Sequence, residues 1–456
     1  MDKGEHPPFA RQYMFIHQYT KPMRQRFILF LLFLTVATGI QAQVADAGID
    51  PLAPKVLQWV KHSQADSLLS HCTPQVKAQM PAATLNGLWQ QLLQQTGEWK
   101  EQGPWQHETK QGLDIYHAIL TFARATLQFH VILTPDRQVA GFTLTPVPPS
   151  AETPTQGTPI PAHCTERDIT VAHGAISLPG TLTLPAHPQG KVPMVVMVQG
   201  SGPSDRNESV GPNKPFRDLA WALAEKGIAS LRYDKRTFVY GQRTAEVSNG
   251  IVNYDSEITE DAVEALSLAA RQPETDTHHI YLLGHSLGGT LAPRIAQKSA
   301  TPISGIIFLA AMARPFWDVV KEQLLYISIC SDDATLRQPD WTSTQLKQMK
   351  AALPPEYLQM QESYQAIATA QSLPPQQRML FMQGGHDYQV TEEDFNLWKE
   401  SLAQSHPLAA FCYFDQLDHL FRPLPEMATP RDYKRPGKIS SEAIQTIVSF
   451  VLDENK

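Results

Sequence analysis

The sequence predicts an α/β fold built on a mostly parallel sheet, preceded by a smaller α+β domain. From residue 163 onward, short apolar runs that indicate strands alternate with helical stretches, which is typical of a mostly parallel sheet. Residues 50–147 instead show helical periodicity followed by alternating strands. A chain of 456 residues is long enough for two domains with additional segments.

The composition allows a large hydrophobic core and argues against a nucleic-acid partner. Hydrophobic residues make up 42% of the chain, which is sufficient for a large core. The chain has 38 Lys and Arg against 45 Asp and Glu, for a net charge of -7, and no basic cluster is longer than Lys434-Arg435. Binding to phosphates requires a basic surface, so we expect no nucleic-acid partner.

The amino-terminal residues predict a signal peptide spanning 1–42. Basic residues precede the apolar run 27–40, and the small residue Ala42 suits a cleavage point. The run is short for crossing a bilayer, so we expect no stable membrane span after cleavage and an exported, periplasmic or secreted protein. An uncleaved anchor is the alternative. Lipid anchoring is disfavoured because no cysteine follows the run directly.

Residues 50–147 predict a small α+β roll whose role the sequence does not indicate. Strands are expected at 114–122, 125–133 and 138–144, after helices in the first half. Four tryptophans at helical spacing are expected to pack in a core or an interface rather than form a ligand cage: Trp59, Trp89, Trp99 and Trp105. The proline-rich stretch 148–162 then predicts an extended linker.

The four cysteines are expected to be free thiols. They are Cys72, Cys164, Cys330 and Cys412. They are widely spaced and form no Cys-x-x-Cys pair, and a chain of this size does not need disulfides. In an exported protein three disulfide pairings would remain possible.

The domain 163–456 contains the alternating elements of the predicted parallel sheet. An antiparallel pair leads, and the later strands are expected at 192–198, 228–233, 280–283, 303–310, 378–383 and 408–414. Helices are expected at 215–226, at 255–271 with Asp255 as its own cap, at 290–298 and at 440–452. The long segment 311–375 predicts a lid insertion. Its aromatic residues line an apolar acyl pocket or pack the lid on the sheet: Trp317, Tyr326, Trp341, Tyr357 and Tyr364.

The strongest local motif is Gly284-His285-Ser286-Leu287-Gly288, between the strand 280–283 and the helix 290–298. A Gly-x-Ser-x-Gly in this setting is a nucleophile elbow, in which glycines allow a sharp turn that exposes the serine hydroxyl. We therefore expect Ser286 to be a nucleophile.

An acid and a base follow the predicted nucleophile in order. Asp387 comes after the strand 378–383, and His419 lies a few residues beyond the strand 408–414. Ligands bind at the carboxyl ends of such strands, and the order Ser, Asp, His is that of α/β-hydrolases. His419 would accept the serine proton and Asp387 would orient it. The rivals are Asp415 and Asp418 for the acid, and His386 and His285 for the base.

The oxyanion hole is expected from two backbone amides. One belongs to Leu287, directly after the nucleophile, and the other to Ser201, in the loop after the strand 192–198. Charged residues near this region are expected to form loop-fixing ion pairs: Asp205 with Arg206, and Asp234 with Arg236.

Four motifs together resemble the bacterial α/β-hydrolase-fold esterases of the serine-aminopeptidase and dienelactone-hydrolase-like group. They are Gln199-Gly200-Ser201-Gly202-Pro203-Ser204-Asp205-Arg206-Asn207, Arg232-Tyr233-Asp234-Lys235-Arg236, Gly284-His285-Ser286-Leu287-Gly288-Gly289 and Gly384-Gly385-His386-Asp387. The resemblance extends to exported two-domain carboxylesterases with a small α+β domain in front. Two positions depart from the pattern: Gln199 stands where His-Gly is frequent, and Pro293 falls inside the elbow helix.

These observations favour a serine carboxylesterase acting on a small-molecule ester through an acyl-enzyme. A peptidase or thioesterase of the same fold is the alternative, and a non-catalytic binding protein on this fold is the alternative from another class. No cofactor and no metal are expected: the chain lacks His-Glu-x-x-His, and the adjacent His278 and His279 would point to opposite faces of a strand.

Overall fold

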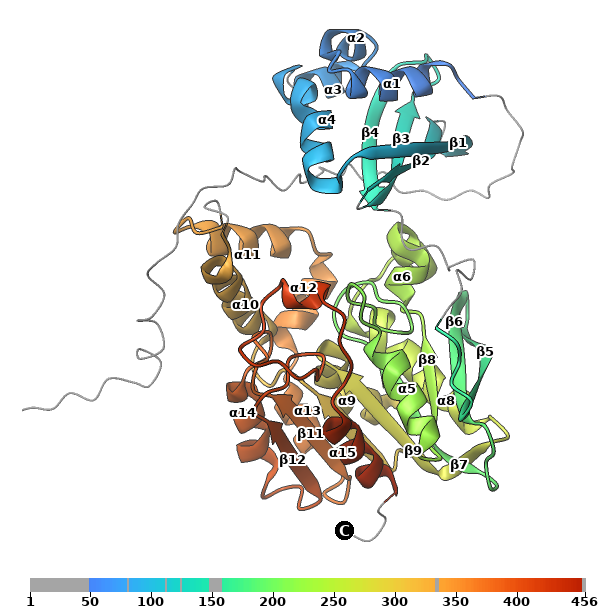
Figure 1. Ribbon diagram of the computed structural model, residues 1–456, viewed down its shortest axis with the longest axis vertical. Coiled ribbons are helices and arrows are strands. Elements are labelled where there is room, and N and C mark those ends of the chain that lie inside the picture. Colours follow the sequence, from blue (N-terminus) through green and yellow to red (C-terminus); the bar gives the residue numbers. More distant parts are fainter. Residues whose placement is uncertain are drawn as a thin grey trace, which may run out of the picture. The chain divides into compact units, whose positions relative to one another are not determined.

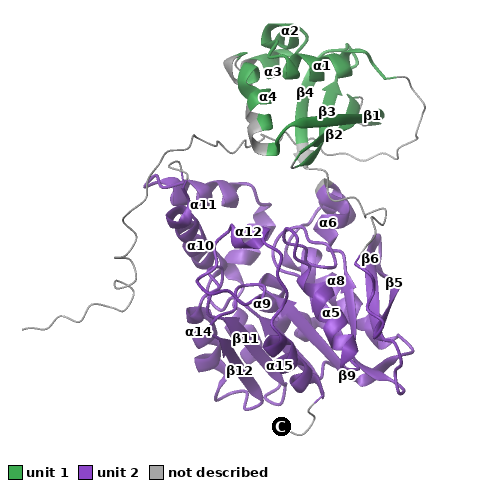
Figure 2. Ribbon diagram, viewed as in Figure 1, with its two compact units in different colours: residues 1–155 green, residues 156–456 purple. Residues whose placement is uncertain are grey.

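The computed structural model contains two compact units, residues 1–155 and 156–456, which Figure 2 shows in green and purple. It describes residues 49–79, 82–110, 113–123, 125–146, 158–332 and 336–452. The predicted signal peptide lies outside these residues, as does most of the predicted linker. Each unit has its own hydrophobic core.

The described part of the first unit combines four helices with an antiparallel sheet. The helices are α1 (Leu52–Lys61), α2 (Ala65–Ser70), α3 (Pro74–Gln79) and α4 (Ala82–Thr96). The strands, in sheet order, are β1 (Trp99–Lys110), β2 (Leu113–Phe122), β3 (Thr126–Leu133) and β4 (Val139–Pro146). Alternate side chains of β2 and β3 are buried, as expected for a sheet with one face covered.

Strand β1 is the element of this unit that the sequence pattern did not predict. It contains Gly103 and Pro104, which are usual turn residues, and its register with β2 shifts between Gln102 and Trp105. A bulge at this point accommodates both residues within a strand. The tryptophans do pack in the core, but Trp99 and Trp105 do so from β1 rather than from a helix.

The second unit is organised around an eight-stranded sheet. Its strands are β5 (Cys164–His173), β6 (Ile176–Pro185), β7 (Val192–Val198), β8 (Ala229–Tyr233), β9 (Thr275–His285), β10 (Gly305–Leu309), β11 (Met379–Gly384) and β12 (Ala409–Phe414). They lie in the order β12-β11-β10-β9-β7-β8-β6-β5. The β5–β6 and β6–β8 pairs are antiparallel and the other pairs are parallel.

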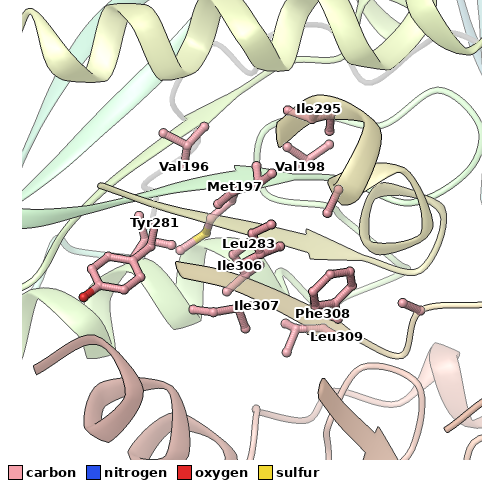
Figure 3. Close-up of a cluster of buried hydrophobic side chains, with 14 of the residues drawn as sticks. Val196, Met197, Val198, Tyr281, Leu283, Ile295, Ile306, Ile307, Phe308 and Leu309 are labelled. Carbon is pink, nitrogen blue, oxygen red and sulfur yellow. The ribbon is translucent and has the colours of Figure 1, made fainter. Parts of the chain in front are cut away.

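The central strands of this sheet are mostly buried. Every residue of β8 and β10 is buried, and apolar side chains of β7, β9 and β10 meet in the core shown in Figure 3. Continuous apolar strands of this kind are expected for a parallel sheet covered on both faces. The prediction of a mostly parallel sheet with a leading antiparallel pair is confirmed.

Helices pack against the sheet, and the contacts among them fall into separate groups. The sheet-covering helices are α5 (Pro215–Glu225), α8 (Glu260–Ala270), α9 (Leu287–Lys298), α14 (Glu392–Leu402) and α15 (Ser441–Leu452). Helix α5 contacts α15, whereas α8 contacts α9. Two short helices, α6 (Arg236–Tyr240) and α7 (Thr244–Val247), follow β8. This architecture is the α/β-hydrolase fold predicted from the sequence.

The helix expected over 255–271 begins differently from the prediction. A π-helical turn, Asp255–Thr259, precedes α8. The side chain of Asn253, not Asp255, accepts the first backbone N–H groups of this turn. Asp255 instead bonds Arg294 and Lys298, because these cations on α9 offer a carboxylate stronger partners than its own helix end does.

The long segment 311–375 is helical. It contains α10 (Phe316–Cys330), α11 (Trp341–Ala351), α12 (Pro355–Ser363) and α13 (Ala366–Gln371). Figure 1 shows α10, α11 and α12 gathered at one end of the second unit, and α10 contacts both of the others. Helix α13 packs against α9 and α14. A lid function for this insertion stays a prediction.

Three further observations concern expectations from the sequence. All four cysteines are free. Within the described residues, no helix has the length and apolar character needed to cross a lipid bilayer. The same part of the chain holds no group of three or more His, Cys, Asp or Glu side chains that could bind a metal ion.

Candidate active site

Ser286 lies in the sharp turn between β9 and α9. Its backbone has φ 52° and ψ −118°, a conformation that residues other than glycine rarely adopt. The Ser286 N–H donates to the carbonyl of Leu309 at 2.8 Å, and its own carbonyl accepts the Thr290 N–H at 2.9 Å. Strain at a single half-buried serine, held by bonds on both sides, is the geometry of a nucleophile elbow.

The glycines around Ser286 are required by close packing of backbone. A Cβ atom at Gly284 would lie 2.4 Å from the backbone of Gly288, and one at Gly288 would lie 2.4 Å from the carbonyl oxygen of Val198. The first turn of α9 is therefore in direct contact with the end of β7. This contact brings the loop after β7 to the nucleophile.

Asp387 follows β11 and is buried. Its Oδ1 atom accepts the backbone N–H groups of Gln389, at 2.7 Å, and Val390, at 3.1 Å. Its Oδ2 atom accepts Nε2 of Gln383 at 3.2 Å. Donors on both oxygens hold the carboxylate in one orientation.

His419 follows β12, and its Nδ1 atom lies 2.6 Å from Oδ2 of Asp387. Both side chains are buried. A carboxylate at Nδ1 fixes the imidazole tautomer in which that nitrogen carries the proton, which leaves Nε2 as the basic nitrogen. Ser286, Asp387 and His419 thus all follow the carboxyl ends of parallel strands of one sheet.

The rivals of Asp387 and His419 have other contacts. Oδ2 of Asp418 accepts two N–H groups of the Arg422 guanidinium, and Asp415 is exposed. Nδ1 of His386 bonds the carbonyl of Leu424 at 2.8 Å. None of these three side chains takes part in the hydrogen bond between Asp387 and His419.

The loop after β7 passes beside the elbow. A Cβ atom at Gly200 would lie 3.2 Å from Cβ of Ser286. Ser201, the next residue, is exposed, and no acceptor within the described part of the chain bonds its N–H. The N–H of Leu287 belongs to the first turn of α9, whose amides have no acceptor within the helix. Leu287 thus directly follows the nucleophile, and Ser201 follows the glycine that approaches it; their role as oxyanion donors stays a prediction.

Gln199 supports this loop through its side chain. Its Nε2 atom donates to the carbonyls of Tyr233 and Asp205. The departure from the family pattern at this position thus retains a side chain that fastens the loop to the end of β8. Pro293 lies within α9, as the sequence indicated.

The charged residues near the loop do fix it, but with partners other than those predicted. Arg206 pairs with Asp234 through two nitrogens, and Arg236 pairs with Asp261. Asp205 accepts backbone N–H groups within its own loop. Both pairs therefore join residues far apart in the sequence rather than residues of one motif.

His285, the other rival for the base, is buried and bonds through both ring nitrogens. Nδ1 lies 2.9 Å from Oε1 of Glu208, and Nε2 lies 2.8 Å from the carbonyl oxygen of His419. Burial alone would lower the pKa of this imidazole, but the nearby Glu208 carboxylate outweighs burial and raises the pKa. Since both partners are acceptors, His285 is best satisfied as the imidazolium.

Two aromatic residues of the insertion attach it to the body of the unit. The Tyr357 hydroxyl donates to Oε2 of Glu257 at 2.6 Å, and the Tyr364 hydroxyl donates to the carbonyl of Thr290 at 3.1 Å. Tyr326 stacks on Tyr388, directly after Asp387. Packing of the insertion, one of the two roles expected for its aromatics, therefore accounts for Tyr357 and Tyr364.

Comparison with known proteins identifies the family. The chain is 31% identical over 433 residues to Esterase EstD of Thermotoga maritima, and the match covers 92% of this chain and 99% of that protein. The chain belongs to the esterase family of that enzyme. It is a hydrolase, and the resemblance drawn from its four motifs is confirmed.

Other matches cover parts of the chain. The family described as serine aminopeptidase, S33, matches residues 213–331, and a family described as a protein of unknown function (DUF3887) matches residues 53–142. A Pyrococcus furiosus esterase is 14% identical, with 63% of this chain and 90% of that chain covered and a TM-score of 0.43. A dienelactone hydrolase of Anabaena variabilis is 15% identical, with 64% and 100% covered and a TM-score of 0.38.

Sequence reasoning missed three charged residues beside the site: Glu208, Lys235 and Glu257. Lys235 lies within a motif that was singled out, but its contacts are to residues far away in the sequence. Glu208 and Glu257 carry no local signal, because each is a single acid whose charged partner, His285 or Lys235, comes from another element.

Proposed function

We propose that the chain hydrolyses carboxylic esters through an acyl-enzyme on Ser286, with His419 as general base and Asp387 as its orienting acid. The observation that carries the proposal is the buried contact between Asp387 and His419 in a sheet whose strand β9 ends in the strained elbow at Ser286. Membership of the esterase family supports it.

In the proposed reaction, Oγ of Ser286 attacks the ester carbonyl carbon while Nε2 of His419 takes the serine proton. Asp387 stabilises the resulting imidazolium. The carbonyl oxygen becomes an oxyanion, to which the N–H groups of Ser201 and Leu287 donate; each such donor is worth about 3 kcal/mol in the transition state. His419 then gives its proton to the leaving alcohol, and water releases the acid in a second round of the same steps.

The test of this function is a comparison of substrates on the purified full chain. We expect hydrolysis of p-nitrophenyl acyl esters that is lost in Ser286→Ala. A serine peptidase is the second candidate, because the match to the serine aminopeptidase family favours it. Faster cleavage of aminoacyl p-nitroanilides than of esters would replace esterase by peptidase, and turnover of neither class would contradict the proposal.

We also propose that the protein is exported with cleavage after Ala42. The basic residues before the apolar run 27–40 and the small residue after it support this. Amino-terminal sequencing of the protein from a periplasmic or secreted fraction tests it. A mature chain that still contains the apolar run would favour an uncleaved anchor.

A further inference from the structure

A buried lysine outside the proposed triad contacts the loop beside the nucleophile. Lys235 follows β8, and its side chain is buried. Its Nζ atom donates to the carbonyls of Gly200, at 2.8 Å, and Gly202, at 3.0 Å, and lies 3.0 Å from Oε1 of Glu257. An ammonium group has three N–H donors and no acceptor, so these contacts use all of them.

A second buried charge holds the same glycine from its other end. Oε1 of Glu208 accepts the Gly200 N–H at 2.7 Å and lies 2.9 Å from Nδ1 of His285. Gly200 therefore has its N–H bonded to a carboxylate and its C=O bonded to an ammonium. Hydrogen bonds to charged groups are the stronger class, so the orientation of this residue is tightly set.

The orientation of Gly200 determines where the Ser201 N–H points. A trans peptide is planar, and its C=O and N–H point in opposite directions. Because the Gly200 carbonyl faces Lys235, the N–H of Ser201 in the same peptide faces away from Lys235. The close approach of Gly200 to Ser286 puts this peptide beside the nucleophile.

We propose that Lys235 and Glu208 are positioning residues that hold the Ser201 N–H in the orientation an oxyanion hole requires. This inference rests on the proposed function. A donor stabilises a developing oxyanion only when it is already oriented before the reaction, since reorientation during the step would cost the free energy gained. The two buried charges supply that preorganisation without touching the substrate.

The same network reaches the helical insertion. Glu257, which holds Lys235, lies in the buried π-helical turn before α8, and its Oε2 atom accepts the Tyr357 hydroxyl from α12. Such turns are frequent at functional sites. The contacts Tyr357–Glu257–Lys235 therefore link the insertion to the loop after β7 that carries Gly200 and Ser201. The position of α12 thus contributes to the orientation of this loop.

The test uses variants that remove one contact each. Lys235→Met removes the ammonium, and Tyr357→Phe removes only the hydroxyl at the far end of the network. The double variant Lys235→Met/Glu257→Gln removes the charges of Lys235 and of its partner Glu257 together. It therefore remains informative if the unpaired Glu257 carboxylate prevents the single variant from folding. The matched control is Tyr364→Phe, which removes an insertion hydroxyl that bonds α9 instead of Glu257.

Two readouts separate positioning from general stability. The first is kcat and KM for a p-nitrophenyl ester. The second is the adduct with a short-chain alkyl trifluoromethyl ketone, in which the serine oxygen bonds the ketone carbon, the serine proton passes to His419 and the ketone oxygen becomes the oxyanion. Titration of this adduct by ¹⁹F NMR gives the pH at which its hydroxyl ionises, and oxyanion donors lower that pH.

We expect Lys235→Met, or the double variant, to lower kcat by about 10- to 100-fold with little change in KM. Its adduct should ionise at higher pH, since about tenfold weaker stabilisation of the oxyanion corresponds to about one pH unit. Tyr357→Phe should shift both readouts in the same direction by less, and Tyr364→Phe should shift neither. Folded lysine variants with unchanged kcat and unchanged adduct ionisation would overturn the inference. Absence of any adduct at Ser286 in the wild type would instead overturn the proposed function, and the inference with it.

Discussion

Nδ1 of His419 lies 2.6 Å from Oδ2 of Asp387, and the two residues follow neighbouring parallel strands, β12 and β11. Backbone N–H groups hold the other carboxylate oxygen. The sheet therefore brings together two loops that are far apart in sequence. The backbone N–H groups orient the Asp387 carboxylate independently of its contact with the imidazole.

Asp387→Asn should lower kcat for ester hydrolysis by at least about 100-fold, because an amide no longer stabilises the imidazolium or selects the tautomer of His419. Steady-state kinetics with a p-nitrophenyl ester measure this. The control is Asp415→Asn, which changes an exposed carboxylate of the loop that carries His419 and should leave kcat unchanged. Full activity of Asp387→Asn would remove this residue from the proposed triad.

Asp418→Asn should destabilise the second unit rather than act on the chemistry directly. Asp418 is buried against Arg422 and accepts two backbone N–H groups of the turn after His419. Removing one partner of a buried pair typically costs about 3–5 kcal/mol of unfolding free energy. Urea unfolding of the variant measures the loss, and Glu246→Gln, in an exposed ion pair, is the control with little expected change. Wild-type stability in Asp418→Asn would contradict this role.

His285 should make stability depend on pH. Its pKa is raised in the folded chain from an ordinary value of 6.5. A raised pKa gives a stabilising contribution that is fully present below about pH 6.5 and is lost as pH rises through the folded value. Urea unfolding of wild type and His285→Gln across this range should show a difference in unfolding free energy that shrinks with rising pH. A difference that grows with pH would mean that His285 is neutral in the folded state.

Gly288→Ala should disrupt the elbow, because its Cβ would lie 2.4 Å from the carbonyl oxygen of Val198 and 2.6 Å from that of Gln199. We expect a lower unfolding midpoint for the second unit and loss of ester hydrolysis. Gly87→Ala is the matched control: the new Cβ has no neighbour within 4 Å, and alanine favours a helix interior by about 0.5–1 kcal/mol. An active, stable Gly288→Ala would show that α9 can move away from β7.

Much of the proposed site was predictable from the sequence because its signals are local. Ser286 is marked by a strand, two glycines and a helix, and Asp387 and His419 are marked by their places after strands.

The supports of the site were not predictable, because each depends on contacts between loops far apart in the sequence. Lys235 bonds carbonyls of Gly200 and Gly202, and its partner Glu257 is turned inward by a π-helical turn that no residue pattern marks. Strand β1 was missed for the opposite reason: a local turn signal, Gly103-Pro104, is overridden by a bulge in the sheet.

The proposed nucleophile, Ser286, can be tested directly by its reactivity. The purified full chain is treated with a fluorophosphonate, and the intact protein and its peptides are then analysed by mass spectrometry. We expect one adduct per chain, located on Ser286 and absent from Ser286→Ala. No adduct in the wild type, or equal labelling of Ser286→Ala, would contradict the proposed role of Ser286.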